Sequence, residues 1–175
     1  MAVETIRDLF ANEIRHMVDT EERVGRLMGT IAAELPDGEA KRLCQEDRAD
    51  TPKQIAALQR CLQTLNVSPG KATCHVLAGF EGEHTEFCAG NPSAAPLAVF
   101  DLDLAVEVKH YEITAYRLLI TKANLLGLEE CQRLLQGNQR DEENRAHQLE
   151  RVDFELTQSL LQILGSQASQ RRQAR

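Results

Sequence analysis

The chain has 175 residues, of which 42% are hydrophobic and only 4% aromatic, and its net charge is −7 with a pI near 5.3. This length accommodates one well-buried domain. The acidic balance excludes the basic surface on which nucleic-acid and anionic-membrane binding depend. No apolar run approaches the roughly 18 residues that span a bilayer, so we expect no nucleic-acid partner and no membrane partner.

The N-terminal stretch MAVETIRDLF lacks the basic region and apolar core of a signal peptide. The cysteines are odd in number and contain no Cys-x-x-Cys pair; they are residues 44, 61, 74, 88 and 131. Reduced thiols are the simplest interpretation in a chain with an ample core. We therefore expect a cytoplasmic protein.

Proline and glycine residues divide the chain into long segments with helical periodicity. The sequence predicts four long helices and a shorter one in the connection between the second and third, at residues 3–35, 38–65, 98–126, 129–164 and 71–89. Tight turns join the first helix to the second and the third to the fourth, so each pair forms an antiparallel hairpin. The predicted fold is all-α: a ferritin-like four-helix bundle of two hairpins joined by a long crossover.

The sequence SQRRQAR at the C-terminus holds the only basic cluster, which a short frayed end explains. We expect the bundle to occupy residues 1–165 as one domain, followed by a flexible, polar and basic tail at residues 166–175.

A carboxylate interrupts the apolar seam of the first helix. Apolar residues follow one another at steps of three and four from Phe10 to Met17 and again from Val24 to Ile31. The position that completes this rhythm between Met17 and Val24 is Glu21, which is therefore predicted to face the core.

The other long helices carry polar residues on or beside their inward faces: Asp47, Asp50, Gln54, Glu112 and Glu142. Glu21 and Asp50 lie 15 and 13 residues from the first turn, and Glu112 and Glu142 lie 15 and 13 residues from the second. The members of each pair should therefore meet at nearly the same level. Four carboxylates, one from each helix, are expected to converge in two matched pairs.

Ionised carboxylates in a low-dielectric core cost several kcal/mol each unless they are compensated. Three kinds of compensation are open. Metal ions can bind between the helices, as in di-iron and di-manganese bundles. The carboxylates can instead share protons with Tyr, Gln and Asn partners. They can also form salt bridges, for which Lys109, Lys122 and Arg145 are near enough along their helices.

Five segments resemble the YciE-type ferritin-like family of bacterial stress-associated proteins. They extend over residues 4–157 and read LFANEIRHMVDTEERV, DTPKQIAALQ, KATCHVLAGFEGE, VKHYEITAYRLL and DEENRAHQL. The most specific piece is HYEITAY, close to the family's His-Tyr-Glu-Ile-x-x-Tyr. The resemblance implies a bundle, usually homodimeric, with a dinuclear metal site, in which Glu21, Gln54, Glu112 and Glu142 match family positions.

The chain departs from the family pattern at the metal site. Asp47 and Asp50 stand where relatives tend to have His and Glu, and Lys109 stands where a second Glu is often found. Lys109 could occupy the space of a cation and replace it with its own charge. His147 lies five residues after Glu142, so it completes no Glu-x-x-His motif, although it is kept as a candidate ligand.

Pro52 lies inside the second helix, where it removes a backbone hydrogen bond to the carbonyl of Arg48. It can kink the helix beside Asp47 and Asp50, or start a new helix capped by Asp50 or Thr51. We favour the kink.

Four potential zinc ligands lie close together in the connecting segment: Cys74, His75, His84 and Cys88. Their spacing matches no recognised zinc motif, so the sequence does not predict a zinc site there.

Two functions stay open. In the first, two divalent ions, Fe or Mn rather than Zn, are bridged by Glu21, Asp50, Glu112 and Glu142 and bind or reduce oxygen or peroxide; Asp47, Gln54 and His147 are further candidate ligands. In the second, the protein is a non-enzymatic structural or interaction homodimer that binds no metal and keeps the carboxylates as a network. A ferritin-type iron store is the weakest alternative.

Contact between Lys109 and Glu112 inside the bundle would argue against a dinuclear cluster. The sequence assigns no catalytic residue.

Overall fold

The structure is a computed structural model that describes residues 3–173, with side chains to Ile163 and at Ser166. Over these residues it contains helices and no strand, which confirms the predicted all-α class. The helices are α1 (Ile6–Glu34), α2 (Glu39–Thr64), α3 (His75–Ala89), α4 (Ala94–Leu125) and α5 (Glu129–Gln173).

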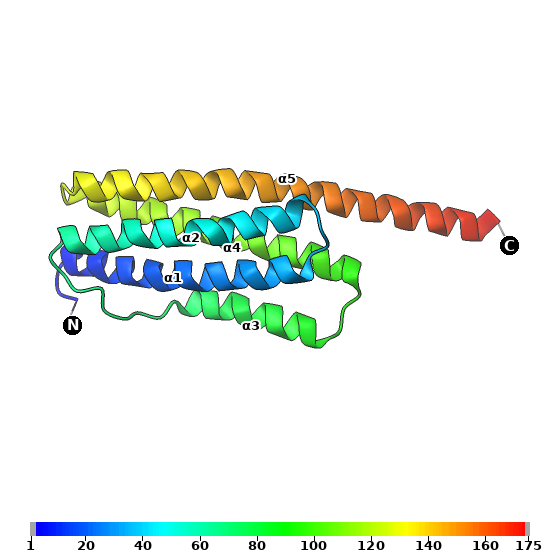
Figure 1. The fold of residues 1–175 in the computed structure, drawn as a ribbon, viewed down its shortest axis with the longest axis horizontal. Coiled ribbons are helices and arrows are strands. Elements are labelled where there is room, and N and C mark those ends of the chain that lie inside the picture. Colours follow the sequence, from blue (N-terminus) through cyan, green and yellow to red (C-terminus); the bar gives the residue numbers. More distant parts are fainter. Residues whose placement is uncertain (1–2, 174–175) are drawn as a thin grey trace.

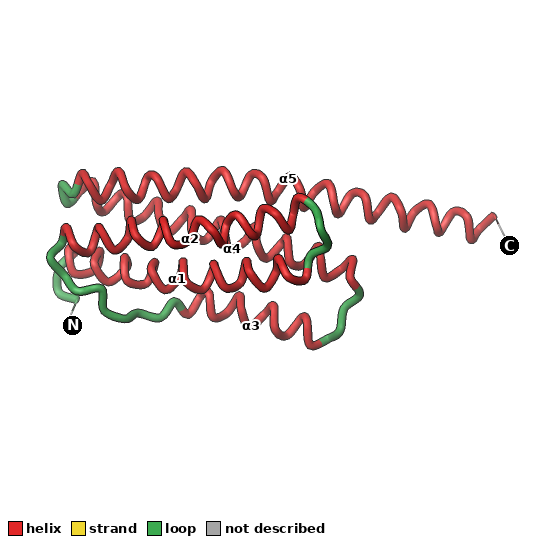
Figure 2. Tube along the Cα trace, viewed as in Figure 1, coloured by secondary structure: helices red, strands yellow, loops and turns green. Residues whose placement is uncertain are grey.

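The four long helices pack in a ring in which α1 contacts α2 and α4, and α5 likewise contacts α2 and α4. Short turns join α1 to α2 and α4 to α5, so each pair is an antiparallel hairpin (Figure 1). The connection between the hairpins runs back along α1 and includes α3, which lies against α1 and α4 outside the ring (Figures 1 and 2).

Local sequence signals explain where two of the helices begin. At the start of α1, the Thr5 hydroxyl accepts a hydrogen bond from the Asp8 backbone N–H (3.1 Å), and the Asp8 carboxylate accepts one from the Thr5 N–H (3.0 Å), which is a capping box. Helix α4 begins at Ala94, earlier than the predicted residue 98. The reason is that Pro96 lies in its first turn, where the missing N–H needs no partner.

Helix α2 passes through Pro52 without a break, so the alternative of a new helix starting there is wrong. Helices α1 and α2 approach each other closely at this level. A Cβ atom on Gly25 of α1 would come within 3.0 Å of the Thr51 hydroxyl oxygen on α2. Because Gly25 has no side chain, the two helices can pack closely at the level where the polar residues of their seams lie.

The apolar core consists of two clusters. One surrounds the α1–α2 turn and includes Val24, Met28, Ile31, Leu43, Leu77, Leu102 and Leu149. The other surrounds the α4–α5 turn and includes Phe10, Ile14, Leu58, Leu62, Leu119 and Leu135. Both clusters draw on α1, α2, α4 and α5, whereas α3 contributes only to the first.

Helix α5 continues to Gln173, past the predicted end at residue 164, and projects beyond the bundle (Figure 1). The flexibility expected for residues 166–175 stays a prediction, and residues 174–175 lie outside the described part of the chain. Among the described helices, none combines the length and the apolar character that crossing a bilayer requires.

Candidate metal centre

A polar layer separates the two apolar clusters, and we name it the central layer. Each helix of the ring contributes one carboxylate to it: Glu21 from α1, Asp47 from α2, Glu112 from α4 and Glu142 from α5, all at most 3% exposed. Oxygen atoms of Glu21, Glu112 and Glu142 lie within 4.8 Å of one another. Three of the four predicted carboxylates therefore converge, and α2 contributes Asp47 rather than Asp50.

Lys109 of α4 lies inside this layer with only 1% of its surface exposed. Its Nζ is 2.6 Å from Glu142 Oε2, 2.7 Å from Glu112 Oε2 and 2.8 Å from Asp47 Oδ2. Burial by itself would lower the pKa of Lys109, but the carboxylates around it raise that pKa well above its usual value. A charged ammonium group thus stands among carboxylates from three helices.

Neutral side chains hold two of the carboxylates in place. The Tyr116 hydroxyl donates a hydrogen bond to Glu21 Oε1, and Gln54 Nε2 donates one to Glu142 Oε1. Asn138 Nδ2 in turn donates to the Tyr116 hydroxyl (2.9 Å) and to the Gln54 carbonyl (3.1 Å). The layer is therefore a connected hydrogen-bond network on the side that faces the α4–α5 turn.

Lys109 balances only part of the negative charge of the central layer. Two buried oxygens, Glu21 Oε2 and Glu112 Oε1, have no hydrogen-bond partner. Burial and the nearby Glu142 raise the pKa of Glu21 to about 8, and the same two causes raise the pKa of Glu112 well above its usual value. Arg145 approaches Asp47 only to 3.7 Å. Protons or a further cation must therefore balance the remaining charge.

Two predicted ligands lie outside the central layer. The Asp50 side chain is 49% exposed, and its Oδ2 is 3.3 Å from Arg145 Nη2. The His147 side chain is 80% exposed, and its Nδ1 is 3.4 Å from Glu150 Oε2. Gln54, by contrast, is buried within the layer, where it contacts Glu142.

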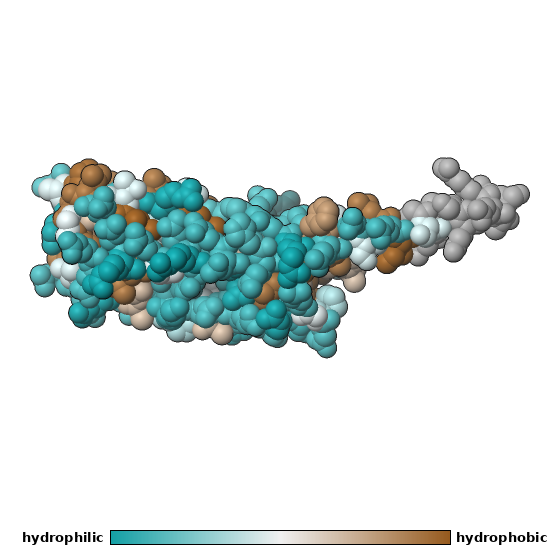
Figure 3. Space-filling view, turned by 90° about the horizontal axis from the view of Figure 1, so that it is seen from above, coloured by the Kyte–Doolittle hydropathy of each residue, from teal (hydrophilic) through white to brown (hydrophobic). Residues whose placement is uncertain are grey.

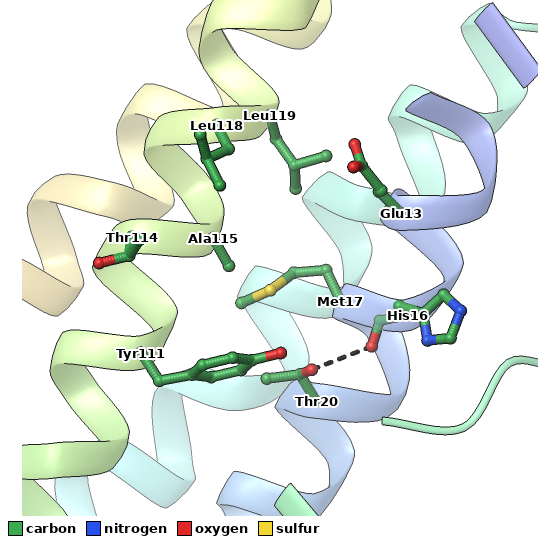
Figure 4. A pocket seen from close by; sticks show the side chains of 9 residues that line it. All are labelled: Glu13, His16, Met17, Thr20, Tyr111, Thr114, Ala115, Leu118 and Leu119. Atoms are coloured by element: carbon green, nitrogen blue, oxygen red, sulfur yellow. Dashed lines mark hydrogen bonds between the residues drawn. The ribbon is translucent and has the colours of Figure 1, made fainter. Parts of the chain in front are cut away.

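A cavity of about 240 Å³ lies beside the layer, between α1 and α4. Figure 4 shows Thr20 of α1 and Tyr111 of α4 on its wall, with the Thr20 hydroxyl donating to the His16 carbonyl (3.0 Å). Its floor is apolar and includes Met17 and Leu119, and no carboxylate of the central layer lines it. The cavity therefore adds no ligand to the layer.

A second polar cluster contains His84 and Cys88, which the sequence offered as potential zinc ligands without predicting a site, together with Glu34 and Asp101, which sequence reasoning missed and which approach His84. One signal was available for Asp101, because it lies four residues before Ala105 and so on the inward seam of its helix. Glu34 lies on a different helix, and only the fold shows that its carboxylate reaches His84.

The fold and the central layer together define an all-helical bundle protein with a buried carboxylate cluster. The chain belongs to the family of domains of unknown function DUF892, which matches residues 5–162. No curated protein matches the sequence.

Three solved structures are similar to this chain. YcfI from Rhodopseudomonas palustris has a TM-score of 0.80 at 23% identity, over 85% of this chain and 94% of that one. The E. coli stress protein YciF has a TM-score of 0.80 at 19% identity, over 89% and 99% of the two chains. A protein from Xanthomonas campestris pv. campestris has a TM-score of 0.73 at 19% identity, over 91% and 98%. Similarity at these identities shows a shared fold.

Proposed function

We propose that this protein is a ferritin-like, stress-associated bundle whose central layer binds one divalent cation. The observation that carries the proposal is the pair of buried, unpartnered oxygens Glu21 Oε2 and Glu112 Oε1. With Glu142 they belong to a group of carboxylates whose oxygens lie within 4.8 Å of one another. Carboxylate oxygens suit hard ions such as Mn²⁺ and Fe²⁺. The stress association rests on the family resemblance and on the fold shared with YciF.

The residues fit one ion and do not fit two. Lys109 Nζ lies within 2.8 Å of oxygens of Asp47, Glu112 and Glu142, which are the oxygens that a second ion would need. A second divalent ion would also face the ammonium charge at close range in a low-dielectric site. The proposed centre therefore holds one metal ion. The ammonium group of Lys109 occupies the place of the second ion that the resemblance implies.

Each residue of the layer has a distinct role in this centre. Glu21, Glu112 and Glu142 would hold the ion, which supplies Lewis-acid chemistry for a small oxygen ligand when bound. Tyr116 and Gln54 orient the carboxylates of Glu21 and Glu142 through their hydrogen bonds, as supporting partners of metal ligands commonly do.

A metal-free structural protein is the second candidate function. It is favoured by the pKa of Glu21, which burial raises to about 8, because a protonated Glu21 needs no cation. In that case Glu21 keeps its proton at neutral pH, and Lys109 supplies the positive charge at the centre of the layer.

Metal analysis separates the two candidates. Protein purified without chelator and reconstituted anaerobically with Mn²⁺ or Fe²⁺ should hold one ion per chain in the central layer. Glu112→Gln removes one ligand and should abolish this binding, whereas Glu143→Gln, a control on the surface of α5, should leave it unchanged. Failure of the wild-type protein to bind either ion supports the metal-free candidate, and two ions per chain in the layer would contradict the role given to Lys109.

We further propose that the protein is a homodimer, with the projecting part of α5 packed against a second copy. Large apolar side chains are exposed there, namely Phe154 (65%), Leu161 (64%) and Ile163 (50%), and Figure 3 shows hydrophobic atoms gathered on this segment. Leu161→Glu should convert dimer to monomer in sedimentation velocity. A monomeric wild-type protein would overturn this part of the proposal.

A further inference from the structure

A second polar cluster lies where the end of α1 and the start of α4 meet α3, and we name it the α3 cluster. It consists of Glu34 on α1, His84 and Cys88 on α3, and Asp101 on α4. His84 Nε2 is 2.9 Å from Glu34 Oε2 and 3.3 Å from Asp101 Oδ1, and Cys88 Sγ is 3.8 Å from His84 Nε2. His84 and Cys88 are four residues apart, so both lie on the same face of α3.

Asp101 is the member of the cluster that most needs a partner. It is 0% exposed, and its Oδ2 has no hydrogen-bond partner. Within the described residues, neither Glu34 nor Asp101 forms an ion pair with a lysine or an arginine, and both carboxylates face the same imidazole. An uncompensated buried carboxylate is costly. A cation bound beside Asp101 would therefore stabilise the folded protein.

The separations of the other three side chains from His84 Nε2 suit a tetrahedral ion. Bonds of about 2.0–2.2 Å to nitrogen and oxygen and of about 2.3 Å to sulfur place neighbouring ligand atoms of zinc roughly 3.3–3.6 Å apart. The separations of Glu34, Asp101 and Cys88 from His84 Nε2 are 2.9, 3.3 and 3.8 Å and therefore bracket that range. The ligand atoms of Glu34, His84 and Cys88 also lie within 4.8 Å of one another.

We propose that Glu34, His84, Cys88 and Asp101 bind one Zn²⁺ ion that fastens α3 to α1 and α4. A set of imidazole nitrogen, thiolate and carboxylate oxygens is one that zinc prefers. The proposed site shares no residue with the central layer, so it does not depend on whether that layer binds metal.

The small number of fully buried side chains on α3 indicates what such an ion would add. Leu77 and His84 are the only buried residues of this helix. Near its first half, Arg23 Nη1 of α1 lies 2.5 Å from Glu81 Oε2, but both side chains are partly exposed, and an ion pair of this kind contributes little. A zinc ion at His84 and Cys88 would hold the second half of α3, which makes the site structural rather than catalytic.

Cobalt substitution tests the proposal directly. Chelator-treated full-length protein titrated with Co²⁺ should develop a thiolate-to-cobalt charge-transfer band that saturates at one ion and disappears when Zn²⁺ is added. Cys88→Ser should abolish the band. Cys74→Ser is the control, because Cys74 precedes the same helix but its thiol lies beside the Tyr111 hydroxyl (3.3 Å), and it should leave the band intact.

Asp101→Asn tests the buried carboxylate with little change in shape. Zn²⁺ affinity should fall by about 100-fold or more, because even the loss of a residue that only supports a metal ligand costs 10–100-fold. Zn²⁺ should also protect residues 65–93 of the wild-type protein from limited proteolysis, and this protection should be lost in Asp101→Asn. Circular dichroism of each metal-free variant shows whether it is folded.

The outcomes also separate this site from the central layer. The band should persist in Glu112→Gln, which removes a ligand of the layer only. Absence of the band in the wild-type protein, or a band that survives Cys88→Ser, would overturn the zinc site. The cluster would then be a contact between the His84 imidazole and two carboxylates without a metal ion.

Discussion

The central layer and the α3 cluster solve the same physical problem in different ways. Each contains a fully buried carboxylate between helices, but the central layer contains its own cation, Lys109, with oxygens of three carboxylates within 2.8 Å of its Nζ. The α3 cluster contains an imidazole and a thiol in place of a lysine. The comparison shows that a buried group of carboxylates can enclose a cation of the protein itself, while groups typical of a zinc site gather elsewhere in the same fold.

The largest expected effect comes from removing the internal cation of the central layer. Lys109→Met should lower the free energy of unfolding of the metal-free protein by about 3–5 kcal/mol, because it leaves buried carboxylates without their partner. Urea denaturation followed by circular dichroism measures this change.

Lys122→Met is the matched control for this experiment. Lys122 lies on the same helix but is 21% exposed and pairs with Glu13 (3.0 Å), so its loss should cost at most about 1 kcal/mol. With Mn²⁺ present, Lys109→Met should bind a second ion in the layer. Equal losses in the two variants would mean that Lys109 is not the cation that holds the layer together.

A smaller effect is expected from pH. Burial raises the pKa of Glu21 from its usual 4.5 to about 8, so between these values the folded state binds a proton that the unfolded state has released. The stability of the metal-free protein should therefore fall as the pH rises from 4.5 to 8. Glu21→Gln should flatten this slope in thermal unfolding measured across that range. A wild-type stability that rises through the same window would contradict the protonated state of Glu21.

In the α3 cluster, substitution should have opposite effects on stability and on binding. Asp101→Asn removes a buried charge with an unpartnered oxygen, so the metal-free protein should gain about 1–3 kcal/mol of stability while losing zinc affinity. Thermal unfolding with and without Zn²⁺ measures both quantities. A zinc-dependent rise in Tm that is as large in Asp101→Asn as in the wild type would exclude Asp101 as a ligand.

The smallest effects are expected at the two predicted ligands that lie outside the layer. Asp50→Asn and His147→Ala alter side chains that are 49% and 80% exposed, so each should change the stability by less than about 0.5 kcal/mol. Both variants should retain the manganese stoichiometry of the wild type. A loss of bound metal in either variant would return that residue to the list of ligands.

Helical periodicity predicted the buried positions of Glu21, Glu112 and Glu142, because each completes an apolar seam of steps of three and four. It could not choose between Asp47 and Asp50. Two residues three positions apart lie on nearly the same side of a helix, and only the packing of α2 against α5 decides which of them is enclosed.

Contacts between distant helices set the limit of what the sequence could predict. The sequence placed Lys109 near Glu112 but left open whether it turned inward or toward solvent, a choice that the surrounding carboxylates determine. Periodicity could indicate the inward position of Asp101 but could not bring the members of the α3 cluster together. Glu34 and His84 come from helices whose contact depends on how the crossover folds back, and spacing along the chain carries no information about that docking.

The division of the apolar core by the central layer has a consequence for cooperativity. Each end of the bundle has its own hydrophobic cluster on the same four helices, and the side chains of the central layer link the two clusters. Segments with separate cores can open as separate units in native-state hydrogen exchange. We therefore expect the protonation and occupancy of this one layer of side chains to change how strongly the opening of the two ends is coupled.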